Sequence, residues 1–333
     1  MSRWVLAFVM LTACTSQQAS VPTPSPSQVL ASSPSPAVIS CRLPYLKTDG
    51  YNPFNAVGFL TLPEGAYEPD NAAGSSLPPG GVQASPIPGG SQPWWDAAMQ
   101  RRIPVSPSSE SPNGSSYAYM SEAGLHVVDI ATGLDTLLYR RPKGVQGGQV
   151  LGFLDATIYI VFPGGVKDGT GGVITNPVGQ VGVWKIDVGT RVSSRVFTSD
   201  QLGVMAAGGL WVAGDQLVEV DVVTGQRTIW FKNPTNFMDF LGVDASGLPV
   251  IWTFDGSGHL DIWHLKGPNK ATIIYSVDYT GDPPVFGPEM QQGLLVADRN
   301  GVWFGAADGL WLYDGTTFRR ISSVSGIPAG PCS

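Results

Sequence analysis

Carboxylates are the side chains of this sequence that could form a catalytic set. The 333 residues include 26 Asp and Glu. Two acidic residues on either side of a glycosidic bond can cleave it, one as general acid and the other as base or nucleophile. The acids that we predict near the innermost strands or their connections are Asp239, Asp282, Glu289 and Asp298. Any chain with this many acids offers such candidates, so a glycoside hydrolase or lyase acting on polysaccharide is our alternative hypothesis.

Other catalytic and metal-binding patterns are missing from the sequence. It has no Gly-x-Ser-x-Gly turn for a nucleophile, no His-Glu-x-x-His, no phosphate-binding loop and no EF-hand loop. His126 and His264 alternate with apolar neighbours, which favours structural roles on strands, and His259 follows a turn and is expected in solvent. The few cysteines and histidines lack the spacing of metal ligands. We therefore expect no metal and no cofactor.

The charge pattern argues against a polyanionic partner. The formal net charge is −7, only 14% of the residues are charged, and no run of Lys or Arg is longer than a pair. Binding to nucleic acid normally needs a clustered basic surface. We expect no nucleic-acid partner.

The first residues are typical of an export signal. A short basic start, residues 1–3, precedes the apolar run 4–11, which is too short to span a bilayer. The run ends in Leu11-Thr12-Ala13-Cys14, which resembles the lipobox of bacterial lipoproteins. The resemblance implies cleavage after residue 13, lipidation of Cys14 and an extracytoplasmic protein held to a membrane by its acyl chains. An ordinary signal peptide with a coincidental cysteine is the alternative.

The next segment is expected to be a tether. From Cys14 to residue 40 the sequence is rich in Ser and Pro and has no charged or aromatic residue. Such a segment cannot bury enough apolar surface to fold. The folded domain is therefore expected over residues 41–333.

The folded region reads as repeated short strands. The whole sequence has 42 Gly and 28 Pro, which favours a turn-rich all-β fold. A unit of alternating strands recurs at intervals of 34 to 58 residues, which bracket the roughly 40 residues of a four-stranded propeller blade. In each copy one strand ends or turns near an anchor position: Asp129, Asp187, Asp221, His264 and Asp314. A carboxylate at a strand end can accept backbone N–H groups of the next turn, so the repeated Asp favours a structural role.

Two of these units resemble known repeats. Residues 111–119, Ser-Pro-Asn-Gly-Ser-Ser-Tyr-Ala-Tyr, resemble the WD40-like and TolB-type repeat, with Asn113 in place of its usual Asp. The last unit, residues 298–320, resembles the regulator-propeller repeat and departs from it at Ala306. The resemblance implies a β-propeller of four-stranded antiparallel blades. We expect six blades, with five or seven as alternatives, the last one built from the hairpin at 41–70 and a closing strand from the C-terminal tail.

A ring-shaped fold would bring its two ends together. If Cys14 carries lipid, Cys41 and Cys332 remain, one at each end of the folded region. An oxidising compartment and close termini favour a disulfide between them. Two unrelated free thiols are the alternative.

The candidate binding surface has two parts. The first is the pair Trp94 and Trp95. Adjacent residues on a strand point to opposite faces, so we expect at least one of the two rings to be exposed. The second is the insertion at 163–177, which carries Lys167 and Asp168 between two predicted strands. We expect a monomeric binding or scaffolding module whose partner is an envelope protein or a carbohydrate, rather than an enzyme.

Overall fold

The structure is a computed structural model that describes residues 38–49, 52–70, 94–97, 100–167, 172–198, 203–235, 237–278, 295–306 and 308–333. These residues belong to one unit, Val38–Ser333. The predicted signal peptide at 1–13, Cys14 and nearly all of the tether at 14–40 lie outside the described residues. The domain boundaries drawn from the sequence therefore stay predictions.

Three sheets each contain four antiparallel strands. The first is β9 (Gln149–Leu154), β10 (Thr157–Phe162), β13 (Gly182–Asp187) and β14 (Ser193–Phe197). The second is β15 (Gly203–Ala206), β16 (Gly209–Val212), β17 (Gln216–Val220) and β18 (Arg227–Lys232). The third is β19 (Phe237–Val243), β20 (Pro249–Phe254), β21 (His259–Gly267) and β22 (Lys270–Asp278). Strands that are neighbours in a sheet follow one another along the chain, apart from the insertion between β10 and β13, and this gives each sheet the meander of a propeller blade.

Two further sets of strands follow the same plan. One is the three-stranded sheet β6 (Ser116–Met120), β7 (Gly124–Asp129) and β8 (Asp135–Arg140). The other is β23 (Leu295–Asp298), β24 (Gly301–Ala306), β25 (Gly309–Tyr313) and β26 (Phe318–Ser322), which is part of a larger sheet. The strands predicted from the repeats are confirmed, because the anchor positions lie in or directly after β7, β13, β17, β21 and β25.

The repeated aspartates shape the turns. Oδ1 of Asp129 accepts hydrogen bonds from the backbone N–H and the hydroxyl of Thr132, both at 2.7 Å. Asp187 makes the same pair of bonds with Thr190, and Asp221 accepts two backbone N–H groups. These bonds lower the pKa values of all three carboxyls. The structural interpretation of the repeated Asp is confirmed.

The C-terminal strand completes a sheet that begins at the N-terminal side of the unit. That sheet contains β27 (Gly326–Pro328), β1 (Cys41–Asp49), β2 (Asn52–Leu62) and β3 (Ala66–Pro69). Leu46 pairs with Ile327 across β1 and β27. Gly326 has φ +152°, and a Cβ there would come within 2.3 Å of the Leu46 carbonyl oxygen, so this approach needs glycine. The predicted closing strand from the C-terminal tail is confirmed.

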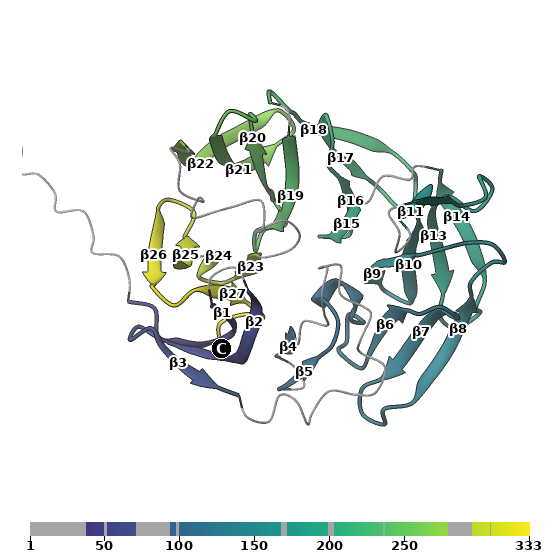
Figure 1. The fold of residues 1–333 in the computed structure, drawn as a ribbon, viewed down its shortest axis with the longest axis horizontal. Helices are drawn as coiled ribbons and strands as arrows, with labels where there is room; N and C mark the ends of the chain where they lie inside the picture. Colours follow the sequence, from purple (N-terminus) through teal and green to yellow (C-terminus); the bar gives the residue numbers. More distant parts are fainter. Residues whose placement is uncertain are drawn as a thin grey trace, which may run out of the picture. The chain divides into compact units, whose positions relative to one another are not determined.

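Contacts between innermost strands join the sheets into a β-propeller. Within the unit, β9 contacts β6 and β15, β19 contacts β15 and β23, and β23 contacts β27. Figure 1 shows these strands at the inner end of successive sheets. The only helical element in the described part is the 3₁₀ turn η1 (Pro107–Ser109). In that part no helix is both long and apolar enough to cross a bilayer.

The number of blades stays a prediction. A two-stranded hairpin, β4 (Trp94–Asp96) and β5 (Arg101–Ile103), stands between β3 and β6 in the chain. Residues 71–93, which precede it, lie outside the described residues. The sheets that are described therefore fit the expected six blades without fixing that number.

Most of the tryptophans pack between sheets, as the sequence predicts. Trp211 and Trp303 are almost completely buried. Trp211 contacts Trp230 of its own sheet edge-on and stacks on Phe240 of the next, with ring centroids 5.1 and 5.5 Å away. Large aromatic rings of this kind fill the space between neighbouring blades.

Candidate ligand-binding cavity

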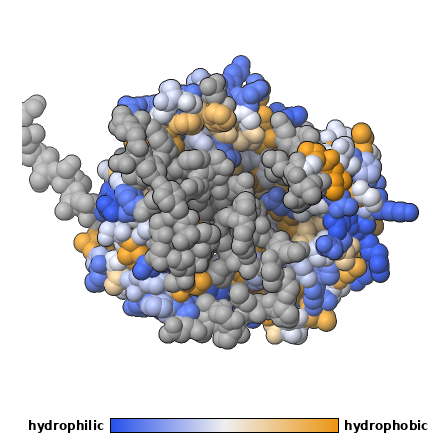
Figure 2. Space-filling model, viewed as in Figure 1, coloured by the Kyte–Doolittle hydropathy of each residue, from blue (hydrophilic) through white to orange (hydrophobic). Residues whose placement is uncertain are grey.

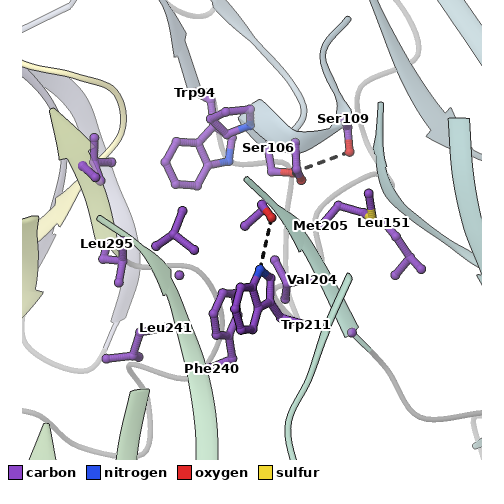
Figure 3. A pocket seen from close by; sticks show the side chains of 18 of the residues that line it. Trp94, Ser106, Ser109, Leu151, Val204, Met205, Trp211, Phe240, Leu241 and Leu295 are labelled. Carbon is purple, nitrogen blue, oxygen red and sulfur yellow. Dashed lines mark hydrogen bonds between the residues drawn. The ribbon is translucent and has the colours of Figure 1, made fainter. Parts of the chain in front are cut away.

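A cavity of about 540 Å³ lies at the inner edges of several sheets. Its walls come from the innermost strands β9, β15, β19 and β23, from the segment that contains η1, and from β4 and residues 330–331. Figure 3 shows side chains from these separate elements around one space. The volume is that of a site for a small organic molecule.

Aromatic rings form two sides of the cavity. Trp94, which is only 6% exposed, lies on one side, and Trp211 and Phe240 lie on the opposite side (Figure 3). The rings of Trp211 and Phe240 are nearly parallel, with 8° between their planes, and Nε1 of Trp211 donates to the Ala206 carbonyl at 3.1 Å. These contacts hold the second pair of rings in a fixed position. Aliphatic side chains fill the rest of the wall: Val150, Leu151, Val204, Met205, Leu241 and Leu295.

A few polar groups interrupt the apolar wall. Ser106, Ser108 and Ser109 lie together at η1, and Oγ of Ser106 is 2.8 Å from Oγ of Ser108 and 3.5 Å from that of Ser109. Gln149 of β9 and Asp239 of β19 also line the cavity. A mainly apolar pocket with a small number of placed polar groups is typical of small-molecule binding sites.

The two charged residues in the described wall are both acidic. Asp244 is occupied, since Oδ2 lies 2.8 Å from Nε2 of His264 and Oδ1 accepts the backbone N–H groups of Ser246 and Leu248. Asp239 is half-buried, and its Oδ1 accepts the N–H of Phe240 at 2.8 Å. Burial raises the pKa of the Asp239 carboxyl above its usual range.

The acids singled out from the sequence do not form a catalytic pair in the described part of the chain. Asp239 lines the cavity, but Asp298 is a structural residue. The Asp298 Oδ2 atom accepts Nε1 of Trp303 at 2.8 Å and the backbone N–H of Cys332 at 2.9 Å. Asp282 and Glu289 lie outside the described residues. Nothing in this geometry favours a glycosidase over a binding site.

The tryptophan pair is placed differently from the exposed surface that the sequence suggested. Trp94 is buried and faces the cavity, and Trp95 is half-buried. The Trp95 ring meets Phe59 edge-on at 4.9 Å, and the guanidinium of Arg102 lies 5.6 Å from its centroid. Trp94 thus contributes to a concave site, and the role of the pair in binding stays a prediction.

The insertion forms a hairpin, as predicted. Strand β11 (Gly165–Lys167) pairs with β12 (Val173–Thr175), and the buried Asn176 fastens its base through bonds to Gln146 and to the Pro163 carbonyl. Val173 and Ile174 are exposed, and Figure 2 shows a hydrophobic patch over this hairpin. Asp168 and the side chain of Lys167 lie outside the described residues, so their place in a binding surface is untested.

A second cluster has the connectivity of a hydrolase triad, but a further carboxylate, that of Asp261, contacts two of its members. Oγ of Ser276 lies 3.3 Å from Nε2 of His259, and Nδ1 of His259 lies 2.5 Å from Oδ1 of Asp278. Asp261, however, lies 3.1 Å from the same Nε2 and 2.7 Å from the Ser276 hydroxyl. The hydrogen bond to Asp278 and the nearby Asp261 raise the pKa of His259. The Ser276 hydroxyl has one proton, and it donates to Oδ1 of Asp261 at 2.7 Å, whereas Nε2 of His259 lies farther away at 3.3 Å. The cluster is therefore interpreted as a hydrogen-bond and ion-pair network, and His259 is not simply solvated.

The sequence did not point to most of the cavity wall. Residues 106–109 read as a polar linker, and the innermost strands 203–206 and 295–298 are short and weakly patterned. The inner strands that line the cavity were indicated only indirectly, because each recognised repeat needs an inner strand just before it. In the described part of the chain, no group of His, Cys, Asp and Glu could hold a metal ion.

Comparisons with known proteins reach no further than the fold. The sequence matches no protein-family model. It also matches no curated protein. Solved structures with a similar fold include an oligogalacturonate lyase in complex with manganese, TolB from Acinetobacter baumannii and an auxiliary nutrient binding protein from Bacteroides thetaiotaomicron.

These structures are distant from this chain. Their sequence identities are 12%, 14% and 13%, and their TM-scores are 0.44, 0.38 and 0.37. The similarity covers 64%, 87% and 66% of this chain and spans 63%, 67% and 55% of the other chains. Similarity this weak carries no argument about ligand or activity. The antiparallel sheets and their inner-strand contacts make this chain a β-propeller.

Proposed function

We propose that this chain is a ligand-binding β-propeller, held at the outside of a bacterial membrane by lipid on Cys14. The observation that carries the proposal is the cavity, with aromatic rings on opposite sides and a few polar groups in an apolar wall. Its occupant is a small organic group, free or borne by an envelope protein or a glycan. Binding and release, rather than bond cleavage, are the chemistry that the described wall supports.

The fold suits a preformed site. Much of the wall lies on the strands β9, β15, β19 and β23 of separate sheets, and the main-chain hydrogen bonds of each sheet fix the position of its strand. The stacked Trp211 and Phe240 and the bond from Trp211 to Ala206 leave the rings little freedom to lose on binding. A site that is already ordered avoids part of the entropic cost of association.

The location outside the cytoplasm is supported by two independent features. The first is the lipobox-like sequence that ends at Cys14. The second is the disulfide between Cys41 and Cys332, since such bonds persist in oxidising compartments. A monomer on a tether could then present its cavity to the surrounding medium.

The test is a thermal-shift screen of the full-length lipoprotein in detergent against a library of small polar and amphipathic molecules. Val204 lines the cavity and is 41% exposed, so Val204→Phe should narrow the site with little effect on folding. Val223 is 79% exposed in a turn away from the cavity, and Val223→Phe is the matched control.

We expect compounds that raise the melting temperature of the wild type and of Val223→Phe but not of Val204→Phe, since a ligand that binds only the folded state stabilises it. Hits that stabilise all three proteins equally would place binding elsewhere and refute the proposal. The proposal would also be refuted if no small molecule raised the melting temperature and only macromolecular partners bound, with both variants binding them as the wild type does.

A further inference from the structure

We infer that the cavity selects an organic cation, with an ammonium group near Asp239 and an apolar body between the aromatic walls. The inference rests on the proposed function, because it names the class of ligand for the same site. Three features support it: the charges in the wall, the unused acceptor capacity of the Asp239 carboxylate and the aromatic rings.

The charged side chains in the described cavity wall are both negative. Asp239 and Asp244 line the cavity, and no Lys, Arg or His is among the described residues of its wall. An anionic ligand would enter a mainly apolar space next to carboxylates, with no compensating cation among the described wall residues. Burying a charge in that way is costly, whereas a cation would be paired. The chain as a whole has a formal charge of −7, which also favours the approach of cations.

The Asp239 carboxylate can accept further hydrogen bonds. Its Oδ1 accepts one hydrogen bond, from the N–H of Phe240, and its Oδ2 has no hydrogen-bond partner among the described residues. Asp244, by contrast, uses both oxygens, on His264 and on its own turn. Because burial disfavours the charged form of Asp239, an ammonium group beside it would restore the missing stabilisation. Asp239 is thus the residue of the wall that gains most from a cation.

The aromatic walls of the cavity also favour a cation. The faces of indole and phenyl rings carry negative potential and attract cations, and tryptophan does so most strongly. Trp94 stands opposite the Trp211–Phe240 pair, so an amine in the cavity has aromatic carbon on two sides (Figure 3). These features suit a primary or quaternary amine with an apolar body.

The experiment compares three soluble probes of similar size on the full-length protein in detergent at neutral pH. They are phenethylamine, which is a cation, 2-phenylethanol, which is neutral, and 3-phenylpropanoate, which is an anion. Calorimetry gives the affinities, and quenching of tryptophan fluorescence reports contact with the cavity. We expect phenethylamine to bind at least tenfold more tightly than the alcohol, and the propanoate to bind more weakly than either.

Two variants locate the selectivity. Asp239→Asn keeps the shape of the side chain and removes its charge, and it should lower the affinity for phenethylamine about tenfold while changing that for the alcohol less than twofold. Asp215 is exposed and is not part of the cavity wall, so Asp215→Asn is the matched loss of one negative charge and should change neither affinity.

The outcomes separate this inference from the proposed function. Equal or tighter binding of the alcohol or the propanoate would overturn the cation selectivity, while binding that Val204→Phe abolishes would still uphold a ligand site. If Asp239→Asn and Asp215→Asn lost affinity for phenethylamine equally, the loss would come from the net charge alone, and the role of Asp239 would be overturned. Absence of binding by all three probes would also refute the inference, and the library screen with Val204→Phe would then decide the proposed function separately.

Discussion

Cys41 and Cys332 are separated by 291 positions in the sequence, yet a disulfide joins them and their Cα atoms lie 5.7 Å apart. Cys332 is also held by its backbone N–H, which donates to Oδ2 of Asp298 at 2.9 Å. The same oxygen accepts Nε1 of the fully buried Trp303. The bond therefore ties β1 to β23 and β24 within the one sheet that contains all three strands.

Removing this disulfide should destabilise the fold. A cross-link that closes so long a loop restricts the unfolded chain strongly, and loop-entropy estimates put its contribution at about 5 kcal/mol as an upper bound. For the double variant Cys41→Ser and Cys332→Ser we expect the free energy of unfolding to fall by about 2 to 5 kcal/mol. Urea denaturation of both proteins under non-reducing conditions measures the difference. A wild-type midpoint that does not respond to reductant would contradict the expectation.

The architecture could be predicted because its signals are local. Turn pairs, alternating strands and the repeated Asp at positions such as Asp129 and Asp221 each depend on a few neighbouring residues. The closing strand and the disulfide followed from one global property, that a ring brings its ends together. The strand pairing of Leu46 with Ile327 bears this out.

The cavity could not be predicted because its residues share no pattern. Trp94, Ser109, Val204 and Phe240 come from four elements, and only the packing of the sheets brings them to one place. A surface role for Trp94 was a reasonable expectation from sequence, since neighbouring residues on a strand point to opposite faces. The packing buried it instead, against a space that forms only when the sheets surround it.

Lipidation of Cys14 makes a prediction about location. In Cys14→Ala, the acyl acceptor is lost, and we expect the protein to leave the membrane fraction or to remain as an unprocessed precursor of higher mass. Cell fractionation with immunoblotting and mass measurement of the N-terminal peptide provide the readout. Cys332→Ser is the control, because it removes a thiol from the folded domain and should leave the membrane association intact. An unchanged distribution of Cys14→Ala between fractions would refute the lipid anchor.

Glu110 should make stability depend on pH near neutrality. Burial of Glu110, together with the carboxyl of Asp96, raises the pKa of Glu110 from 4.5 to about 7. The folded state thus holds a proton that the unfolded state releases at lower pH. Its contribution to stability is complete below about pH 4.5 and is lost as the pH rises through about 7. Since Glu110 is only half-buried, we expect a loss on the order of 1 to 2 kcal/mol.

The variant Glu110→Gln isolates this effect. The amide stays neutral, so the variant should be more stable than the wild type at pH 8. Its free energy of unfolding should also lack the decrease between pH 5 and pH 8 that ionisation of Glu110 causes in the wild type. Urea denaturation at both pH values gives the four free energies that are needed. Glu64→Gln, in an exposed turn, is the control and should follow the wild type. If the wild type and Glu110→Gln show the same pH dependence, Glu110 does not retain its proton in the folded state.

The His259 cluster predicts a charged histidine rather than a catalytic one. With Asp278 at Nδ1 and Asp261 at Nε2, the protonated ring is stabilised, and the pKa of His259 is raised above 6.5. In Asp278→Asn the strongest of these interactions is lost, so the pKa of His259 should fall. Titration of the imidazole Hε1 resonance by NMR measures both values. His126, which contacts Asp135 instead, is an internal control whose resonance should keep its position in this variant. A wild-type His259 that titrates at or below 6.5 would mean that its ring is free to act as a base, and the Ser276 hydroxyl would then become a candidate nucleophile.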